Sequence, residues 1–321
     1  AGVTGLLLYN MGSAILRAVG NSVYPFLFLV VSALLNTAMD LIFVIAFNMG
    51  TAGVAYATIA AQLVSAILVM AMLFKTDSSV RVRLKSLHID KSILGGIFRI
   101  GLPAALQMSV TAFSNIFVQS YINFFGSDCM GGWTAYSKID QLLFLPMNSL
   151  SLATQTFVGQ NLGRKLTDRT RRGVRTSLTM SMLCTAVLII PVVAFAPSLV
   201  RFFIDESEAG VIHYGTLFLR MISPFYVMCC LNQIYGGALR GAGEAKVSMV
   251  IMLGSFVLFR QIYLFVVSNY VSNTVVAISL GYPFGWLLCS ILMLVFYKRI
   301  FKDERQFPEY ALTRSQDLPK I

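Results

Sequence analysis

Charged residues are scarce in this sequence. Only 12% of its 321 residues are Asp, Glu, Lys or Arg, whereas 57% are hydrophobic and the mean hydropathy is +0.74. A soluble domain carries about 25% charged residues, so this composition excludes a soluble protein of this length. We therefore expect a polytopic membrane protein with an all-α fold, because apolar runs of this length cross a bilayer as helices.

Acidic residues are scarcer than basic ones, 14 against 25, which gives a net charge of +11. A basic balance can indicate a nucleic-acid partner. Here most Lys and Arg fall in alternate connections between apolar runs, which is the positive-inside pattern of cytoplasmic loops. The charge therefore indicates a lipid bilayer as partner and no nucleic acid. We expect a multi-pass protein of a cytoplasmic membrane, from a prokaryote.

Cysteine and histidine are also few, with five Cys and two His. Four of the cysteines lie inside apolar runs and only Cys129 falls in an expected loop, so no disulfide framework is indicated. Neither residue type has the spacing of a zinc site, and no span holds a cluster of His, Cys or acids at catalytic spacing. We expect no cofactor and no enzyme, and these absences disfavour the alternative of an integral membrane enzyme.

Apolar runs predict half a helix at residues 2–16 and then eight full spans. Their boundaries are 25–47, 54–74, 97–124, 133–158, 177–195, 214–238, 247–267 and 274–297. At 1.5 Å per residue they match a hydrocarbon core of about 30 Å. Because the chain begins without Met inside an apolar stretch, we expect it to be a piece of a longer protein.

One polar segment, residues 75–96, is the only convincing linker. It predicts a partial first lobe at 1–74 and a second lobe at 97–297, with the basic linker on the cytoplasmic side. The charged segment 298–321 is expected to be a cytoplasmic tail with little structure.

An internal repeat connects the two predicted lobes. The pattern LRxxG occurs at residues 16–20 and again at 239–243, and the same interval separates Ser32 from Ser255. Each copy ends an outward-to-inward helix and is followed by two more spans. This predicts parallel repeats related by an axis along the membrane normal.

A second motif, GQNLG at residues 159–163, lies between the span 133–158 and a dense basic loop. We expect its glycines, like those of the LRxxG copies, to permit close turns at helix ends rather than to bind a ligand. The residues of these structural motifs are Gly159, Gln160, Asn161, Gly163, Arg17, Gly20, Arg240 and Gly243.

In chain order the sequence contains ILRAVGNSVYP, NTAMD, FRIGLPAALQ, YSKIDQLLFLP, TFVGQNLG and GALRGAGEAK. This ordered set resembles the multidrug and toxic compound extrusion transporters over about residues 5–298. The resemblance implies two six-helix lobes facing a central cavity, and export of organic, often cationic compounds in exchange for Na⁺ or H⁺. It also implies that this chain lacks about the first three and a half helices and supplies the end of the fourth through the twelfth.

The sequence departs from this family at two helices where such transporters often carry acids. The span 97–124 offers only Gln107, Thr111, Asn115 and Gln119, and the span 214–238 offers Cys229, Cys230, Asn232 and Gln233. The cation site described for some members lies in the first helix, which this chain does not contain. Na⁺ and H⁺ therefore both remain open as coupling ions.

Only two acids fall inside spans, Asp140 and Asp40. Ionisable groups in a membrane are costly and usually face a cavity, which makes both functional candidates. At helical spacing Asp140 shares a polar stripe with Tyr136, Phe144, Asn148, Ser151 and Gln155, as expected for a cavity wall. The alternative for Asp140 is a structural ion pair with Arg260 or Lys138.

Asp40 shares a helix face with Asn36 and Ser32 at a spacing of four residues. The carboxylate is therefore expected to accept a hydrogen bond from the Asn36 amide. A role in coupling and a structural polar clamp between helices are equally compatible with this pattern.

Together these features favour a secondary antiporter that exports small organic, cationic compounds by alternating access, as a monomer. The candidates for coupling or substrate binding are Asp140, Asp40, Asn36, Tyr136, Asn148, Gln155, Gln107, Asn115 and Arg260. The alternative is a lipid-linked oligosaccharide flippase of related fold. Its cavity would need several basic residues for a pyrophosphate, whereas the spans contain only Lys138, Arg220 and Arg260. A channel would need a repeated filter or a charged ring, which the sequence does not show.

Overall fold

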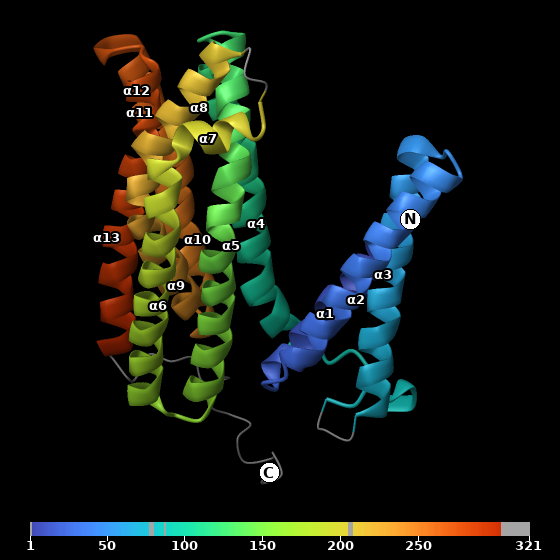
Figure 1. The fold of residues 1–321 in the computed structure, drawn as a ribbon. Helices are drawn as coiled ribbons and strands as arrows, with labels where there is room; N and C mark the ends of the chain where they lie inside the picture. Colours follow the sequence, from blue (N-terminus) through green and yellow to red (C-terminus); the bar gives the residue numbers. More distant parts are fainter. Residues whose placement is uncertain (1, 77–79, 87, 205–207, 303–321) are drawn as a thin grey trace. The chain divides into compact units, whose positions relative to one another are not determined.

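A computed structural model describes residues 2–76, 80–86, 88–204 and 208–302, and every regular element in this part is a helix (Figure 1). The all-α prediction is confirmed. The chain divides into two compact units, Ala1–Asp90 and Lys91–Ile321, and the division falls inside the segment predicted as a linker. The predicted tail from residue 303 onward and the acidic residues 205–206 lie outside the described residues.

Unit 1 is a small bundle in which α3 (Gly50–Lys75) packs against both α1 (Val3–Ala18) and α2 (Val23–Leu41). A π-helical turn, Ile42–Ala46, extends α2 and a 3-10 turn, Leu84–Ser86, follows α3. The contacts use small residues: a Cβ on Gly12 would lie 2.9 Å from Val69, and Ala61 of α3 is buried. Small residues let helix backbones approach closely where lipid gives no hydrophobic driving force.

Unit 2 is a larger bundle organised around α5, which packs against α6, α8 and α9 (Figure 1). Its helices are α4 (Lys91–Asn123), α5 (Ser127–Gly163), α6 (Thr167–Ala194), α7 (Ala196–Arg201), α8 (Ala209–Ile222), α9 (Tyr226–Gly241), α10 (Ala245–Leu253), α11 (Arg260–Val266), α12 (Val275–Ser279) and α13 (Gly281–Lys302). Short 3-10 and π-helical segments at Ser223–Phe225 and Gly254–Phe259 join α8 to α9 and α10 to α11, and Val267–Val271 follows α11.

All eight predicted spans coincide with helices or with such joined pairs. By length and composition, seven of the described helices are apolar enough to cross a membrane. The helix α5 is not among them, because the polar stripe that includes Asp140 lowers its hydropathy. It begins at Ser127, so the connection expected between the spans 97–124 and 133–158 is mostly helix, and Cys129 is buried in α5 rather than in a loop.

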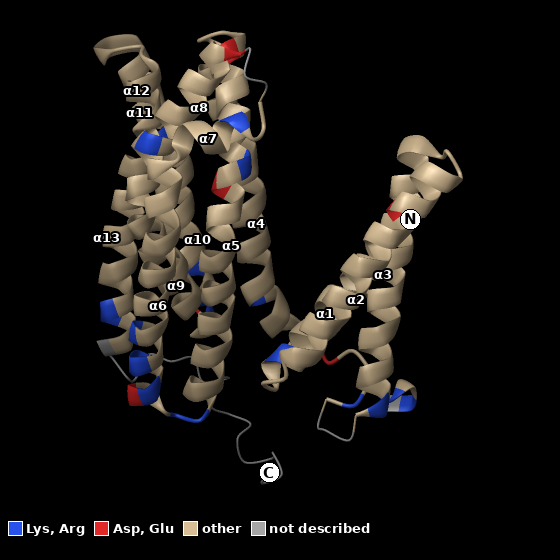
Figure 2. Cartoon of the chain, viewed as in Figure 1, with Lys and Arg blue, Asp and Glu red and all other residues tan. Residues whose placement is uncertain are grey.

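Basic residues gather at one end of each unit (Figure 2). In unit 2 this end contains the α5–α6 turn and the end of α13, and in unit 1 the basic residues lie at and beyond the ends of α1 and α3. Between the ends, large apolar side chains such as Leu145, Leu183 and Ile190 are exposed. An apolar belt with a basic end is the surface expected of a membrane protein.

The two LRxxG copies have the same local structure. The helices α1 and α9 both contain 16 residues and end at these copies. Gly20 and Gly243 both have φ of +87°, and their N–H groups donate to the Arg17 and Arg240 carbonyls at 3.0 and 3.1 Å. A positive φ favours glycine, so the turn role predicted for these two glycines is confirmed.

The turn role predicted for Gly159 is wrong, because α5 continues to Gly163. Gly163 is the last residue of the helix, as predicted, but the positive φ of the turn, +58°, belongs to Lys165. Gly159 lies inside the helix, where a Cβ would sit 3.5 Å from the Gly241 carbonyl oxygen. Asn161 donates to the Phe157 carbonyl at 2.7 Å, a contact within α5, and Gln160 is exposed.

Candidate functional site

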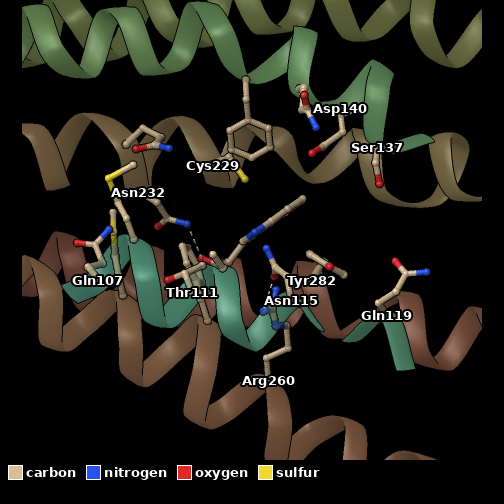
Figure 3. Close-up of a pocket in the computed structure, with 18 of the residues that line it drawn as sticks. Gln107, Thr111, Asn115, Gln119, Ser137, Asp140, Cys229, Asn232, Arg260 and Tyr282 are labelled. Carbon is tan, nitrogen blue, oxygen red and sulfur yellow. Dashed lines mark hydrogen bonds between the residues drawn. The ribbon is translucent and has the colours of Figure 1, made fainter. Parts of the chain in front are cut away.

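Unit 2 contains a cavity of about 550 Å³ (Figure 3). Its polar lining comes from Gln107, Thr111, Asn115, Gln119, Ser137, Asp140, Gln141, Asn232, Gln233 and Arg260. Its aromatic lining comes from Trp133, Tyr136, Phe144, Phe256, Tyr282 and Trp286. An apolar and aromatic cavity of this size with a few polar groups is typical of a small-molecule site.

The α4 wall of the cavity is polar. Gln107, Thr111, Asn115 and Gln119 follow one another at four-residue spacing, which places them on one helix face. All four line the cavity, including the two sequence candidates Gln107 and Asn115. The Gln107 amide contacts the Met252 sulfur at 2.7 Å.

Asp140 lies on the α5 wall and is held by two tyrosines. The Tyr136 hydroxyl, one turn away on α5, is 3.2 Å from Asp140 Oδ1, and the Tyr226 hydroxyl of α9 also donates to this oxygen. The two hydroxyls lie 3.2 Å apart. Because hydroxyls donate without carrying charge, they orient the carboxylate and leave its negative charge uncompensated.

The alternative for Asp140, an ion pair with Arg260, does not form in the described part of the chain. Arg260 instead donates to Ser114 Oγ at 3.0 Å and Asn115 Oδ1 at 2.8 Å, and its guanidinium lies 4.9 Å from the Tyr282 ring. Lys138, the other proposed partner, lies over the Phe203 ring at 5.5 Å. The α4 side chains satisfy two of the Arg260 donors, and aromatic rings separate it from Asp140.

The α5 stripe is predicted to form a cavity wall, and the structure places its upper half on this cavity, while its lower half forms hydrogen bonds with α9. Asn148 accepts a hydrogen bond from Gln233 at 3.0 Å, and Gln155 accepts one from Arg240 at 3.3 Å. The cause is the close approach of α9, where a Cβ on Gly237 would lie 2.5 Å from the Ser151 carbonyl oxygen. Only the upper half, Tyr136 to Phe144, lines the cavity.

Arg240 joins three helices at this contact. Besides Gln155, its guanidinium donates to Ser151 of α5 at 3.1 Å and to Ser248 of α10 at 3.3 Å. Arg240→Met should lower the free energy of unfolding of the purified protein by about 2–4 kcal/mol, since charged hydrogen bonds are lost and the buried Ser151 and Ser248 hydroxyls lose their donor. A lower unfolding midpoint would measure this loss. Arg220→Met, at an exposed position of α8, is the matched control and should have little effect. Equal losses in both variants would contradict this role of Arg240.

The candidate pair in unit 1 does not form the predicted hydrogen bond. Asn36 Nδ2 and Asp40 Oδ1 are each buried without a hydrogen-bond partner. Ser32, on the same face, donates to the Ala61 carbonyl of α3 at 2.7 Å. The Asn36 and Asp40 side chains do not reach one another along the helix. Of the three side chains on this face, only Ser32 forms a hydrogen bond to another helix.

Comparison with known proteins agrees with this architecture. The sequence pattern of the MatE family matches residues 103–266, which is about half of the chain and covers much of α4 through α11. The chain belongs to the MatE family. Proteins of this family are membrane transporters and not enzymes, and this MatE chain is a multi-pass cell-membrane protein.

Two bacterial relatives match nearly the whole MatE chain. The probable multidrug resistance protein YpnP of Bacillus subtilis is 28% identical over 96% of this chain and 68% of its own length. The probable multidrug resistance protein YoeA of the same organism is 26% identical over 94% of this chain and 66% of its own length. The chain therefore spans about two thirds of the length of these relatives.

Solved structures show the same fold. A MOP-superfamily transporter from Pyrococcus furiosus superimposes with a TM-score of 0.91 at 21% identity, over 95% of this chain and 68% of that one. A MATE crystal structure in the bent conformation gives 0.87 at 20% identity, over 98% and 68%.

Three residues that line the cavity or contact Asp140 were not predicted from the sequence. Trp133 and Trp286 are not among the sequence candidates, yet both line the cavity, and Tyr226 contacts Asp140 from another helix. Trp133 lies seven residues before Asp140, on the same helix face, so this spacing was a usable signal. Tyr226 had no such signal, because its contact depends on how α9 packs against α5.

Proposed function

We propose that this MatE chain acts in a secondary transporter that exports small organic cations, such as drugs and toxins, in exchange for Na⁺ or H⁺. The observation that carries the proposal is Asp140, a carboxylate at an aromatic cavity that is held by two neutral hydroxyls and has no cationic partner among the described residues. The names of the two bacterial relatives, as multidrug resistance proteins, support it.

An uncompensated carboxylate in a membrane protein favours occupation by a cation. A proton, a sodium ion and an organic cation can each neutralise Asp140, and one carboxylate compensates one charge at a time. Competition for this group would couple entry of the ion to release of the substrate, provided that each binds the inward and outward states differently. The aromatic lining adds stacking and cation–π contacts for organic cations.

The cavity also favours this function over a flippase for lipid-linked oligosaccharides. A pyrophosphate headgroup requires several basic residues, and Arg260 is the single cation among the described lining residues. A monomer is part of the proposal, because one unit of one chain supplies all of this lining. In unit 1, Asp40 is a second candidate for ion coupling, since its Oδ1 has no partner.

Transport by inverted membrane vesicles tests this proposal. The vesicles come from cells that express the complete open reading frame containing this chain, and ethidium is added to the outside medium under an imposed Na⁺ gradient or an imposed pH gradient. Accumulation that depends on one of the two gradients, and is absent without the protein, is the expected result and identifies the coupling ion. Folded protein that moves ethidium under neither gradient would contradict the proposal.

A further inference from the structure

The cavity holds a second charged group that no opposite charge balances among the described residues. Arg260 is only 5% exposed, yet it lines the cavity, and its Nε–H has no hydrogen-bond partner. Its two side-chain acceptors, Ser114 and Asn115, are both neutral. Leaving a buried guanidinium without a counter-ion and with an unused donor is costly, so this arrangement favours an anion from outside the chain.

Aromatic rings separate this cation from Asp140. The Arg260 guanidinium lies 4.9 Å from the Tyr282 ring, and Tyr282 lies 5.5 Å from Trp133. Trp133 is 4.9 Å from Tyr136, whose hydroxyl donates to Asp140. In Figure 3 the labelled Arg260 and Asp140 lie on opposite sides of the view, with Tyr282 between them. A ligand that contacts both charges must therefore place an apolar, ring-shaped body along this aromatic layer.

We propose that Arg260 forms an anion subsite, so that the cavity selects amphoteric aromatic compounds, with an amine at Asp140 and a carboxylate or similar acid at Arg260. A guanidinium binds a carboxylate through paired, charge-assisted hydrogen bonds. An amphoteric ligand compensates both buried charges, whereas a simple cation leaves Arg260 unpaired and a simple anion leaves Asp140 unpaired. This inference rests on the proposed function only in its consequence for transport. A measurement of ligand affinity tests the anion subsite separately.

The chain carries its own reporter of occupancy. It contains two tryptophans, and both Trp133 and Trp286 line this cavity. Tryptophan fluorescence of the purified protein therefore reports on ligands at this site. The probe is a biphenyl with an aminomethyl group at one para position and a carboxylate at the other, and its methyl ester is the matched comparison, which keeps the amine and the rings but loses the anion.

The wild-type protein should bind the amino acid form at least about tenfold more tightly than the ester, the range expected for a charge-assisted hydrogen bond. Arg260→Met should remove this preference, and Arg260→Lys, which keeps the charge but not the fork of donors, should retain part of it. Arg220→Met, on an exposed face of α8, should keep the full preference. The unfolding midpoint of each variant identifies any that fail to fold.

Equal affinity of the wild-type protein for acid and ester would overturn the anion subsite, whatever the variants do. A preference that survives Arg260→Met in folded protein would also overturn it. The proposed function fails in a different way: no gradient drives export, although the acid still binds more tightly than the ester in an Arg260-dependent manner. Ethidium export without acid selectivity leaves the function in place and removes this inference.

Discussion

Asp140→Asn is expected to reduce ion-driven export by on the order of a hundredfold while leaving the protein folded. The substitution keeps the shape of the side chain and its ability to accept from Tyr136 and Tyr226, but it removes the negative charge. Since a charge-assisted contact contributes about 1.5–3 kcal/mol, its loss should weaken cation binding by about one to two orders of magnitude. Without the carboxylate, the ion and the substrate no longer compete for one group, so export should no longer depend on the ion gradient. The measurement is gradient-driven ethidium uptake by inverted vesicles.

Asp128→Asn is the matched control for this experiment. Asp128 lies on the same helix, loses the same charge on substitution, and is exposed outside the cavity. It should export normally. Tyr226→Phe, which removes one donor but keeps the carboxylate, should have an intermediate effect. Normal export by Asp140→Asn would show that coupling lies elsewhere, and Asp40 in unit 1 would become the candidate to test.

Gly237→Leu is expected to prevent the stable folding of unit 2. A Cβ at this position would lie 2.5 Å from the Ser151 carbonyl oxygen and 2.8 Å from its hydroxyl oxygen, so the obstacle includes backbone that cannot turn aside. Even Gly237→Ala should cost about 1–3 kcal/mol, because α9 must move away from α5. The separation would also weaken the Arg240 contacts that join these helices.

The control is Gly101→Ala in α4, where a Cβ would meet nothing within 4 Å. There alanine should be neutral or should stabilise the helix by up to about 1 kcal/mol through its higher helix propensity. Of the two alanine variants, only Gly237→Ala should therefore lower the unfolding midpoint. Equal shifts would show that the α5–α9 approach is not as close as the structure indicates.

The sequence by itself determined the membrane class, the helical spans and the two LRxxG turns. Each of these depends on neighbouring residues: a run must be long enough to cross the bilayer, and Gly20 and Gly243 must reach a positive φ at a helix end. The sequence also identified Asp140, because an acid inside an apolar run is costly wherever the helix lies. It predicted the wrong turn at Gly159, because a glycine near the end of an apolar run does not by itself mark the helix end, and α5 continues to Gly163.

Only the tertiary structure decided which groups share the cavity. Asp140 contacts Tyr226 and not Arg260, and the lower half of the α5 stripe forms hydrogen bonds with α9. These outcomes depend on the distance between helices far apart in the chain, which small residues such as Gly237 set. Spacing along a single helix shows which residues share a face. Which other helix covers that face depends on packing. Local spacing therefore identified the candidate residues, and the packed bundle determined their contacts.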